Sequence, residues 1–84
     1  MVRQMTAREC VANRILELCQ ERNLAVNALA RSAGVAPSTL KSIINGASKN
    51  PGVVTLKMLC DGLNISLTEF FDTEAFRNLE QEIR

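Results

Sequence analysis

Histidine, tyrosine and tryptophan are absent from this 84-residue sequence, and its only aromatic residues are three phenylalanines. Without histidine the chain lacks the commonest general base and a common metal ligand, so we expect no enzymatic activity. The three cysteines, Cys10, Cys19 and Cys60, include no C-x-x-C pair and are odd in number. We therefore expect no metal, no cofactor, and reduced thiols that are buried as small apolar side chains.

Long apolar runs are missing as well. The sequence contains no apolar stretch of about 18 residues, which a membrane helix would need, and no cationic start followed by an apolar segment. These absences predict a cytoplasmic protein with no membrane partner. Because 46% of the residues are apolar, we expect one compact domain with a core rather than a disordered chain.

Acidic residues are missing from the middle of the chain. Residues 22–60 contain five basic residues and no acidic one, whereas residues 61–84 contain six acidic and two basic residues. The net charge of +1 therefore hides a strongly basic segment beside an acidic one. Such an asymmetry indicates a polyanionic partner, although chance clustering on a solvated surface is the alternative. The five basic residues are Arg22, Arg31, Lys41, Lys49 and Lys57.

Apolar residues recur at helical spacing along most of the chain, and no useful β-alternation is present. Thr6 followed by Glu9 forms a capping box that predicts a helix over residues 7–22. Apolar residues at i, i+3, i+4 and i+7 predict a second helix over residues 26–33, and Pro37 marks the start of a third over residues 37–45. The segment "GASKNPG" predicts a loop. The fold class is therefore all-α.

The second part of the chain predicts three shorter elements. Apolar residues between positions 56 and 63 indicate a fourth helix, and Ser66 with Glu69 forms a second capping box before a fifth. Phe76, Leu79 and Ile83 lie at helical spacing and predict a tail helix within residues 73–84. A helix this short is marginal in water, so it must pack either on the first and fifth helices of its own chain or on a second copy, and we favour the second copy. The predicted division is a domain of residues 1–72 and a tail of residues 73–84.

Residues 34–36, "GVA", separate the second and third predicted helices by a very short turn. Such a turn needs a residue that accepts positive φ, which Gly34 supplies. Leu40 and Ile43 would fix the third helix to the core, while Ser38 and Lys41 belong to a polar stripe that points outward. This arrangement predicts a helix-turn-helix whose second helix enters the major groove of DNA.

The segment "LAVNALARSAGVAPSTLKSIINGASKNPGVVTLKMLCDGLNISLTEFF", residues 24–71, resembles the Cro and phage-repressor-type helix-turn-helix family of bacterial regulators. The resemblance implies a compact five-helix domain in which Pro37, Ser38 and Ser42 face bases and Lys41 faces bases or phosphate. Many members have Gln at the position of Val26, and Asn27 could replace its phosphate contact. The residues that the resemblance assigns to DNA binding are Asn27, Pro37, Ser38, Thr39, Lys41, Ser42, Asn45, Ser48 and Lys49.

These observations predict a sequence-specific regulator, most simply a repressor, that binds double-stranded DNA as a homodimer. Two alternatives remain open: an antitoxin whose acidic tail covers a small protein partner, or a protein-interaction module with the same fold. Arg8 and Arg14 are either phosphate contacts or members of a solvated, salt-bridged face with Glu9 and Glu17. Lys57 lies outside the motif and is expected to be solvated.

Overall fold

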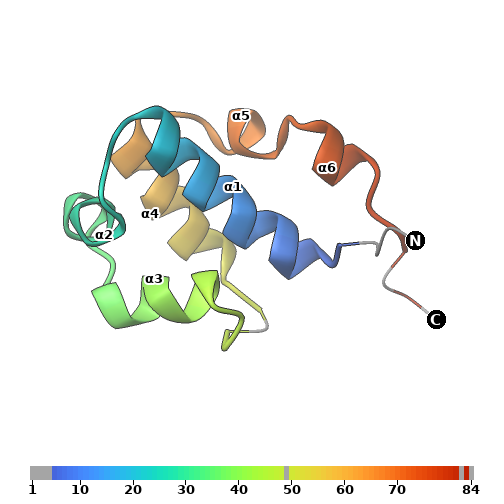
Figure 1. The fold of residues 1–84 in the computed structure, drawn as a ribbon, viewed down its shortest axis with the longest axis horizontal. Coiled ribbons are helices and arrows are strands. Elements are labelled where there is room, and N and C mark those ends of the chain that lie inside the picture. Colours follow the sequence, from blue (N-terminus) through green and yellow to red (C-terminus); the bar gives the residue numbers. More distant parts are fainter. Residues whose placement is uncertain (1–4, 49, 82, 84) are drawn as a thin grey trace.

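The computed structural model describes residues 5–48, 50–81 and 83. These residues form six helices and no strand, so the predicted all-α class is confirmed (Figure 1). Their bounds are α1 Ala7–Glu21, α2 Val26–Ala33, α3 Pro37–Ile44, α4 Val53–Leu63, α5 Leu67–Phe71 and α6 Glu74–Arg77.

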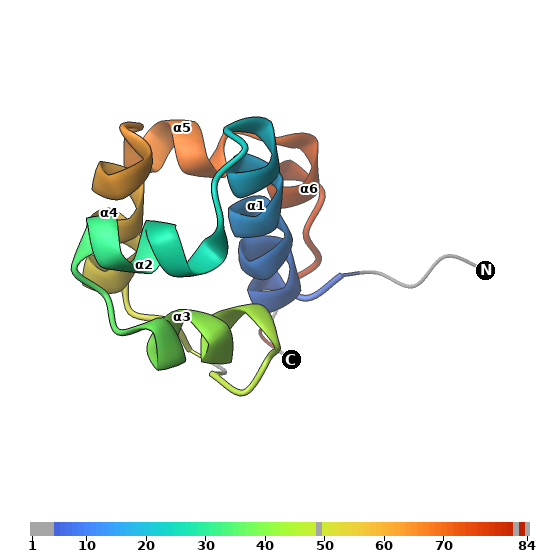
Figure 2. The ribbon, with the colours of Figure 1, turned by 60° about the vertical axis from the view of Figure 1, so that its left-hand side comes forward.

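The core lies between α1, α2, α3 and α4 and is closed by α5. Leu29, Leu40, Leu59 and Phe70 are completely buried in it, and α2 packs on α4 while α1 packs on α3. Burying each such side chain contributes about 1.5–3 kcal/mol to folding. The α3 helix lies on the opposite side of the bundle from α5 and α6 (Figures 1 and 2). One long face of α3 is therefore left without protein cover.

The turn between α2 and α3 has the geometry that the sequence predicts. Gly34 adopts φ 71° and closes α2, and the amides of Gly34 and Val35 donate to the carbonyls of Arg31 and Ala30. Val35 is buried, so the turn is anchored to the core. These contacts fix the angle at which α3 leaves α2.

A second glycine, which the sequence pattern did not single out, lets α2 and α4 approach closely. A Cβ atom on Gly62 would lie 3.1 Å from the Cβ of Ala33 and 3.2 Å from Leu29 Cδ1. At these distances Ala33 or Leu29 would have to shift by a few tenths of an ångström to make room for the added atom. The close approach holds the helix-turn-helix firmly on α4.

The tail differs from the predicted helix over residues 73–84. Within its described part only α6, Glu74–Arg77, is helical, and the amide of Leu79 already bonds back to Phe76 in a turn. Phe76 packs on the chain's own Phe70 and Phe71, with ring centroids 6.1 and 4.9 Å away. Because so short a helix is not stable alone, the chain is helical only where Phe76 fastens it to the core. Phe76 thus packs on its own chain, the alternative to packing on a second copy.

All three cysteine thiols are free and buried, as expected. Burial raises the pKa of Cys10, Cys19 and Cys60, which keeps each thiol protonated and unreactive. Across the part of the chain that the structure describes, no group of His, Cys, Asp and Glu could hold a metal ion. Among the same residues, no helix is both long and apolar enough to cross a membrane.

Candidate nucleic-acid interface

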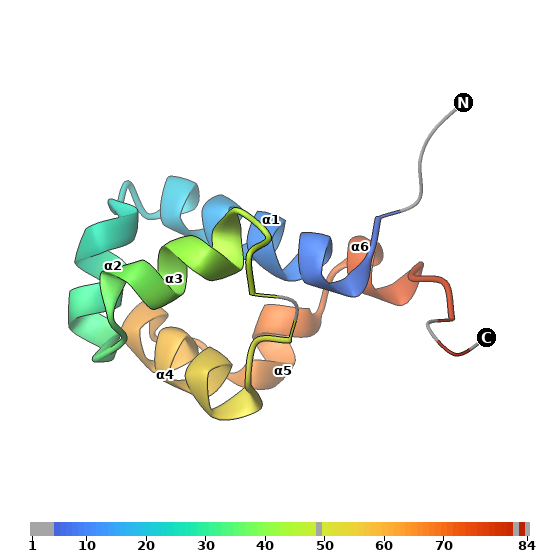
Figure 3. The ribbon, with the colours of Figure 1, turned by 90° about the horizontal axis from the view of Figure 1, so that it is seen from below.

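The α3 helix divides into a buried face and an exposed one. Leu40 and Ile43 point into the core, which turns Ser38, Lys41 and Asn45 toward solvent. Seen from below, α3 runs across the near side of the molecule with α2 beside it (Figure 3). Three predicted contacts complete this face: Pro37 and Thr39 are exposed in the first turn, and Ser42 is half-buried.

The loop after α3 folds back onto the helix. The amide of Ser48 donates to the carbonyl of Ser42 at 3.0 Å, which holds Ser48 beside the end of α3. Gly46 lies at the tip with φ 84°, and the amides of Gly46 and Ala47 make no hydrogen bond to any described residue. Lys49, the remaining predicted contact in this loop, lies outside the described residues.

The start of α2 carries the last predicted contact. Val26 packs against the core, whereas Asn27, the next residue, is exposed. Both α2 and α3 begin at an alanine, Ala25 and Ala36, that makes no side-chain capping bond. The positive ends of both helices therefore face solvent with free N–H donors.

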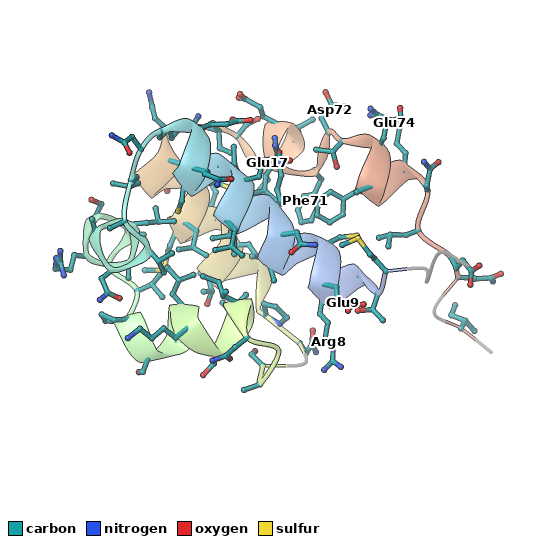
Figure 4. All side chains as sticks on the ribbon, viewed as in Figure 1. Arg8, Glu9, Glu17, Phe71, Asp72 and Glu74 are labelled. Carbon is teal, nitrogen blue, oxygen red and sulfur yellow. The ribbon has the colours of Figure 1, made fainter. Side chains whose placement is uncertain are left out.

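Charge is unevenly distributed around this surface. Of the basic residues in the acid-free segment that the structure describes, Arg31 and Lys41 form no ion pair. Lys57 is exposed and pairs with Asp61 on α4, in agreement with its predicted solvation. The acidic side chains of Glu17, Asp72 and Glu74 lie on the other side of α1, toward α5 and α6 (Figure 4).

Arg14 is a structural residue rather than a phosphate contact. Its side chain is only 13% exposed, Nε donates to the carbonyl of Phe70 at 2.8 Å, and Nη2 donates to the carbonyl of Glu69 at 3.0 Å. It also pairs with Glu17. The guanidinium thus caps the end of α5 and ties it to α1. The sequence pattern could not predict this role, because the two carbonyls lie 55 and 56 residues after Arg14 in the chain.

Comparison with known proteins identifies the same architecture. A model of the Cro/C1-type HTH DNA-binding domain matches residues 14–75. The HTH-type transcriptional regulator SlrR of Bacillus subtilis (strain 168) is 40% identical over 62 residues, which are 73% of this chain and 41% of SlrR. The chain thus spans about two fifths of the length of this curated relative.

Two solved structures are also similar. The prophage Lp1 protein 11 is 34% identical with a TM-score of 0.78, and the match covers 88% of this chain and 97% of that one. SinR bound to DNA, described as a master regulator for biofilm formation, is 31% identical with a TM-score of 0.66 over 74% of this chain and 98% of that one. SinR has also been solved in a complex with a SinI protein. These relatives agree with a binding protein rather than an enzyme.

Proposed function

This chain belongs to the Cro/C1-type helix-turn-helix DNA-binding family, and from that premise we propose that it regulates transcription by binding operator DNA through α3. The observation that carries the proposal is the exposed polar face of α3, whose opposite face is locked into the core by Leu40 and Ile43. A helix held in this way can enter the major groove without losing its own support. Occupying an operator then blocks or recruits polymerase.

Phosphates are proposed to bind around the base-reading face. The uncapped starts of α2 and α3 offer backbone N–H donors and a positive helix end, which suit an anion. Contacts of this kind position the protein on the duplex but do not read its sequence. The side chains proposed to bind the sugar-phosphate backbone are Asn27, Thr39, Asn45, Ser48 and Lys49.

Base recognition is proposed to rest on Pro37, Ser38 and Ser42, with Lys41 touching bases or phosphate. A good bidentate contact to a base discriminates by about 1–3 kcal/mol, but a serine hydroxyl makes only a single adaptable bond. Sequence-dependent DNA shape is therefore proposed to contribute to selectivity.

A second copy of the chain is the proposed protein partner on DNA. Paired half-sites lie about 34–36 Å apart, and the longest dimension of the molecule is 36 Å, so neighbouring copies would meet if their long axes lie along the duplex. Since α6 packs on its own protomer, we place the dimer contact in the tail beyond it, where Ile83 is 79% exposed. Deleting residues 79–84 should convert a sedimenting dimer into a monomer that still folds. Equal sedimentation of both chains would exclude the tail as the contact.

A small protein partner is a second proposal, favoured by the complex between the similar SinR and SinI proteins. Purification from native cells at moderate salt should then yield the chain together with a second small protein in stoichiometric amount. Recovery of the chain alone would count against such a partner.

Selection from a random duplex pool tests the main proposal and returns the operator together with it. The logarithm of the affinity for the selected duplex should fall linearly with the logarithm of the salt concentration.

Two lysine variants test the phosphate contacts. Lys41→Glu and Lys49→Glu should each weaken binding about tenfold and flatten that salt dependence, because each change removes a phosphate contact. Lys57→Gln is the control, since Lys57 pairs with Asp61 on α4. Failure to enrich any duplex, with no salt-dependent binding, would refute DNA binding.

A further inference from the structure

Arg8 reaches from the first turn of α1 to the loop that follows α3. Its Nη1 donates to the carbonyl of Gly46 at 3.5 Å, across 38 residues of sequence. The side chain is exposed and extends toward the α3 side of the molecule, away from Asp72 and Glu74 (Figure 4). A residue outside the helix-turn-helix therefore lies at the edge of the proposed DNA-binding surface.

The guanidinium of Arg8 forms no ion pair with any residue in the described part of the chain. Arg14, Arg22 and Arg77 each form an ion pair with a carboxylate, whereas Arg8 forms none. Its neighbour Glu9 turns its carboxylate to the helix cap, where Oε1 accepts from the amide of Thr6 at 2.9 Å and from its hydroxyl at 3.1 Å. The guanidinium thus remains available to an external anion.

A polar hollow separates the start of α1 from the end of α3. It has a volume of about 390 Å³, and its polar lining residues are Arg8, Glu9, Asn13, Asn45 and Gly46. The Glu9 carboxylate is held at the helix cap by the amide and hydroxyl of Thr6. Two side-chain amides and a guanidinium therefore surround one opening, beside the unbonded backbone amides of Gly46 and Ala47. Such a set of donors suits the two anionic oxygens of a phosphate diester.

The hydrogen bond between Arg8 and Gly46 is long and therefore weak. Arg8 can exchange it for a phosphate contact at little cost in free energy. At 3.5 Å the bond to Gly46 lies beyond the usual 2.7–3.2 Å range of N–H···O bonds, whereas a guanidinium–phosphate contact is shorter and stronger. We infer that Arg8 binds a backbone phosphate of the same duplex that α3 reads, and so extends the contact surface to α1. The inference rests on the proposed function.

The test compares Arg8→Gln, Arg8→Lys and the wild-type full-length chain on one duplex over a series of salt concentrations. Losing one phosphate contact makes the negative slope of log affinity against log salt shallower by about 0.9 and weakens binding several-fold at low salt. Arg8→Lys keeps the charge and should keep most of the slope. A residue that only positions the loop would change the affinity without changing the salt slope. Arg77→Gln, on the far side of α1, is the matched control and should leave the slope unchanged.

Three different results would overturn the inference. If Arg8→Gln and the wild type show equal slopes on a duplex that both bind, Arg8 makes no phosphate contact and the proposed function stands. If affinity falls while the slope is unchanged, Arg8 acts by holding the loop. A wild-type chain that binds no duplex at all overturns the proposed function itself, and the inference with it.

Discussion

The helices α1, α5 and α6 begin differently from α2, α3 and α4. Thr6, Ser66 and Thr73 each accept a backbone N–H at the start of the first group, and each of those helices has a glutamate in its first turn. The second group begins at Ala25, Ala36 and Gly52, with no side-chain cap and no acidic residue in the first turn. The two groups also differ in sequence charge, since residues 22–60 contain no acid.

Two of the three uncapped helices, α2 and α3, form the proposed binding part, which α4 holds from behind. The capped helices α1, α5 and α6 form a supporting part, with Arg8 at the start of α1 on the border between the two. A side-chain N-cap contributes about 0.5–2 kcal/mol, so the absence of three such caps is costly for a small domain. The helices that lack them are instead held by the core and by the close approach at Gly62. Their free N–H groups suit a phosphate, which would complete the cap when DNA binds.

The largest expected effect lies in the supporting part, at Arg14. Arg14→Gln should lower the free energy of unfolding by about 1.5–3 kcal/mol, because it leaves the carbonyls of Phe70 and Glu69 without a charged donor. The salt dependence of DNA binding should not change. Urea denaturation measures the loss, and the exposed Arg8→Gln is the control, with an expected change within about 0.5 kcal/mol. A stable Arg14→Gln variant with a flatter salt dependence would move Arg14 into the DNA-binding surface.

The second effect concerns the turn that links α2 to α3. Gly34→Val should cost about 1–3 kcal/mol, because a β-branched residue is strained at φ 71°. Space is not the cause, since the nearest atom to an added Cβ is Met58 Cε at 3.6 Å. Gly34→Asn is the control, because Asn23 and Asn64 already adopt φ 52° and 60° in this chain. Equal melting temperatures for the valine and asparagine variants would show that the turn relaxes to another geometry.

The third prediction concerns the effect of adding a side-chain N-cap to α3. Ala36 occupies the N-cap position of α3 with φ −59° and ψ 134° and makes no capping bond, so Ala36→Ser and Ala36→Asp should each stabilise the free protein by about 0.5–1 kcal/mol. The aspartate should also weaken DNA binding several-fold, because its charge occupies the proposed phosphate position, while serine should weaken it less. Thermal melts and binding titrations measure the two quantities. If aspartate and serine bind DNA equally well, the start of α3 is not near a phosphate.

Much of the fold could be predicted from local patterns in the sequence. The capping box at Thr6 and the left-handed closing residue Gly34 were both found where expected, because each signal acts within a few residues. Periodicity alone placed Leu40 and Ile43 in the core and thereby predicted the outward face of α3.

The remaining features depend on contacts between distant segments, which periodicity does not report. The close approach at Gly62 arises from the packing of α4 on α2, and the partners of Arg14 lie on α5. The sequence could not decide where the tail packs, because the contact of Phe76 with Phe70 and Phe71 depends on the position of α5 in the folded chain. Arg8 remained ambiguous in the sequence, since nothing local connects it to Gly46.

The smallest expected effect concerns base preference within the binding part. Ser38 is exposed in the first turn of α3, and its side chain is too short to hold a phosphate across the groove. Ser38→Ala should therefore change total affinity little while altering the preference at one base pair by up to about 1 kcal/mol. Ser42→Ala should act in the same direction but less strongly, because Ser42 is half-buried. Repeating the duplex selection with both variants, and with the exposed Ser32→Ala on α2 as control, measures these preferences. If all three variants return the wild-type sequence, the chain selects its site through DNA shape rather than through serine contacts.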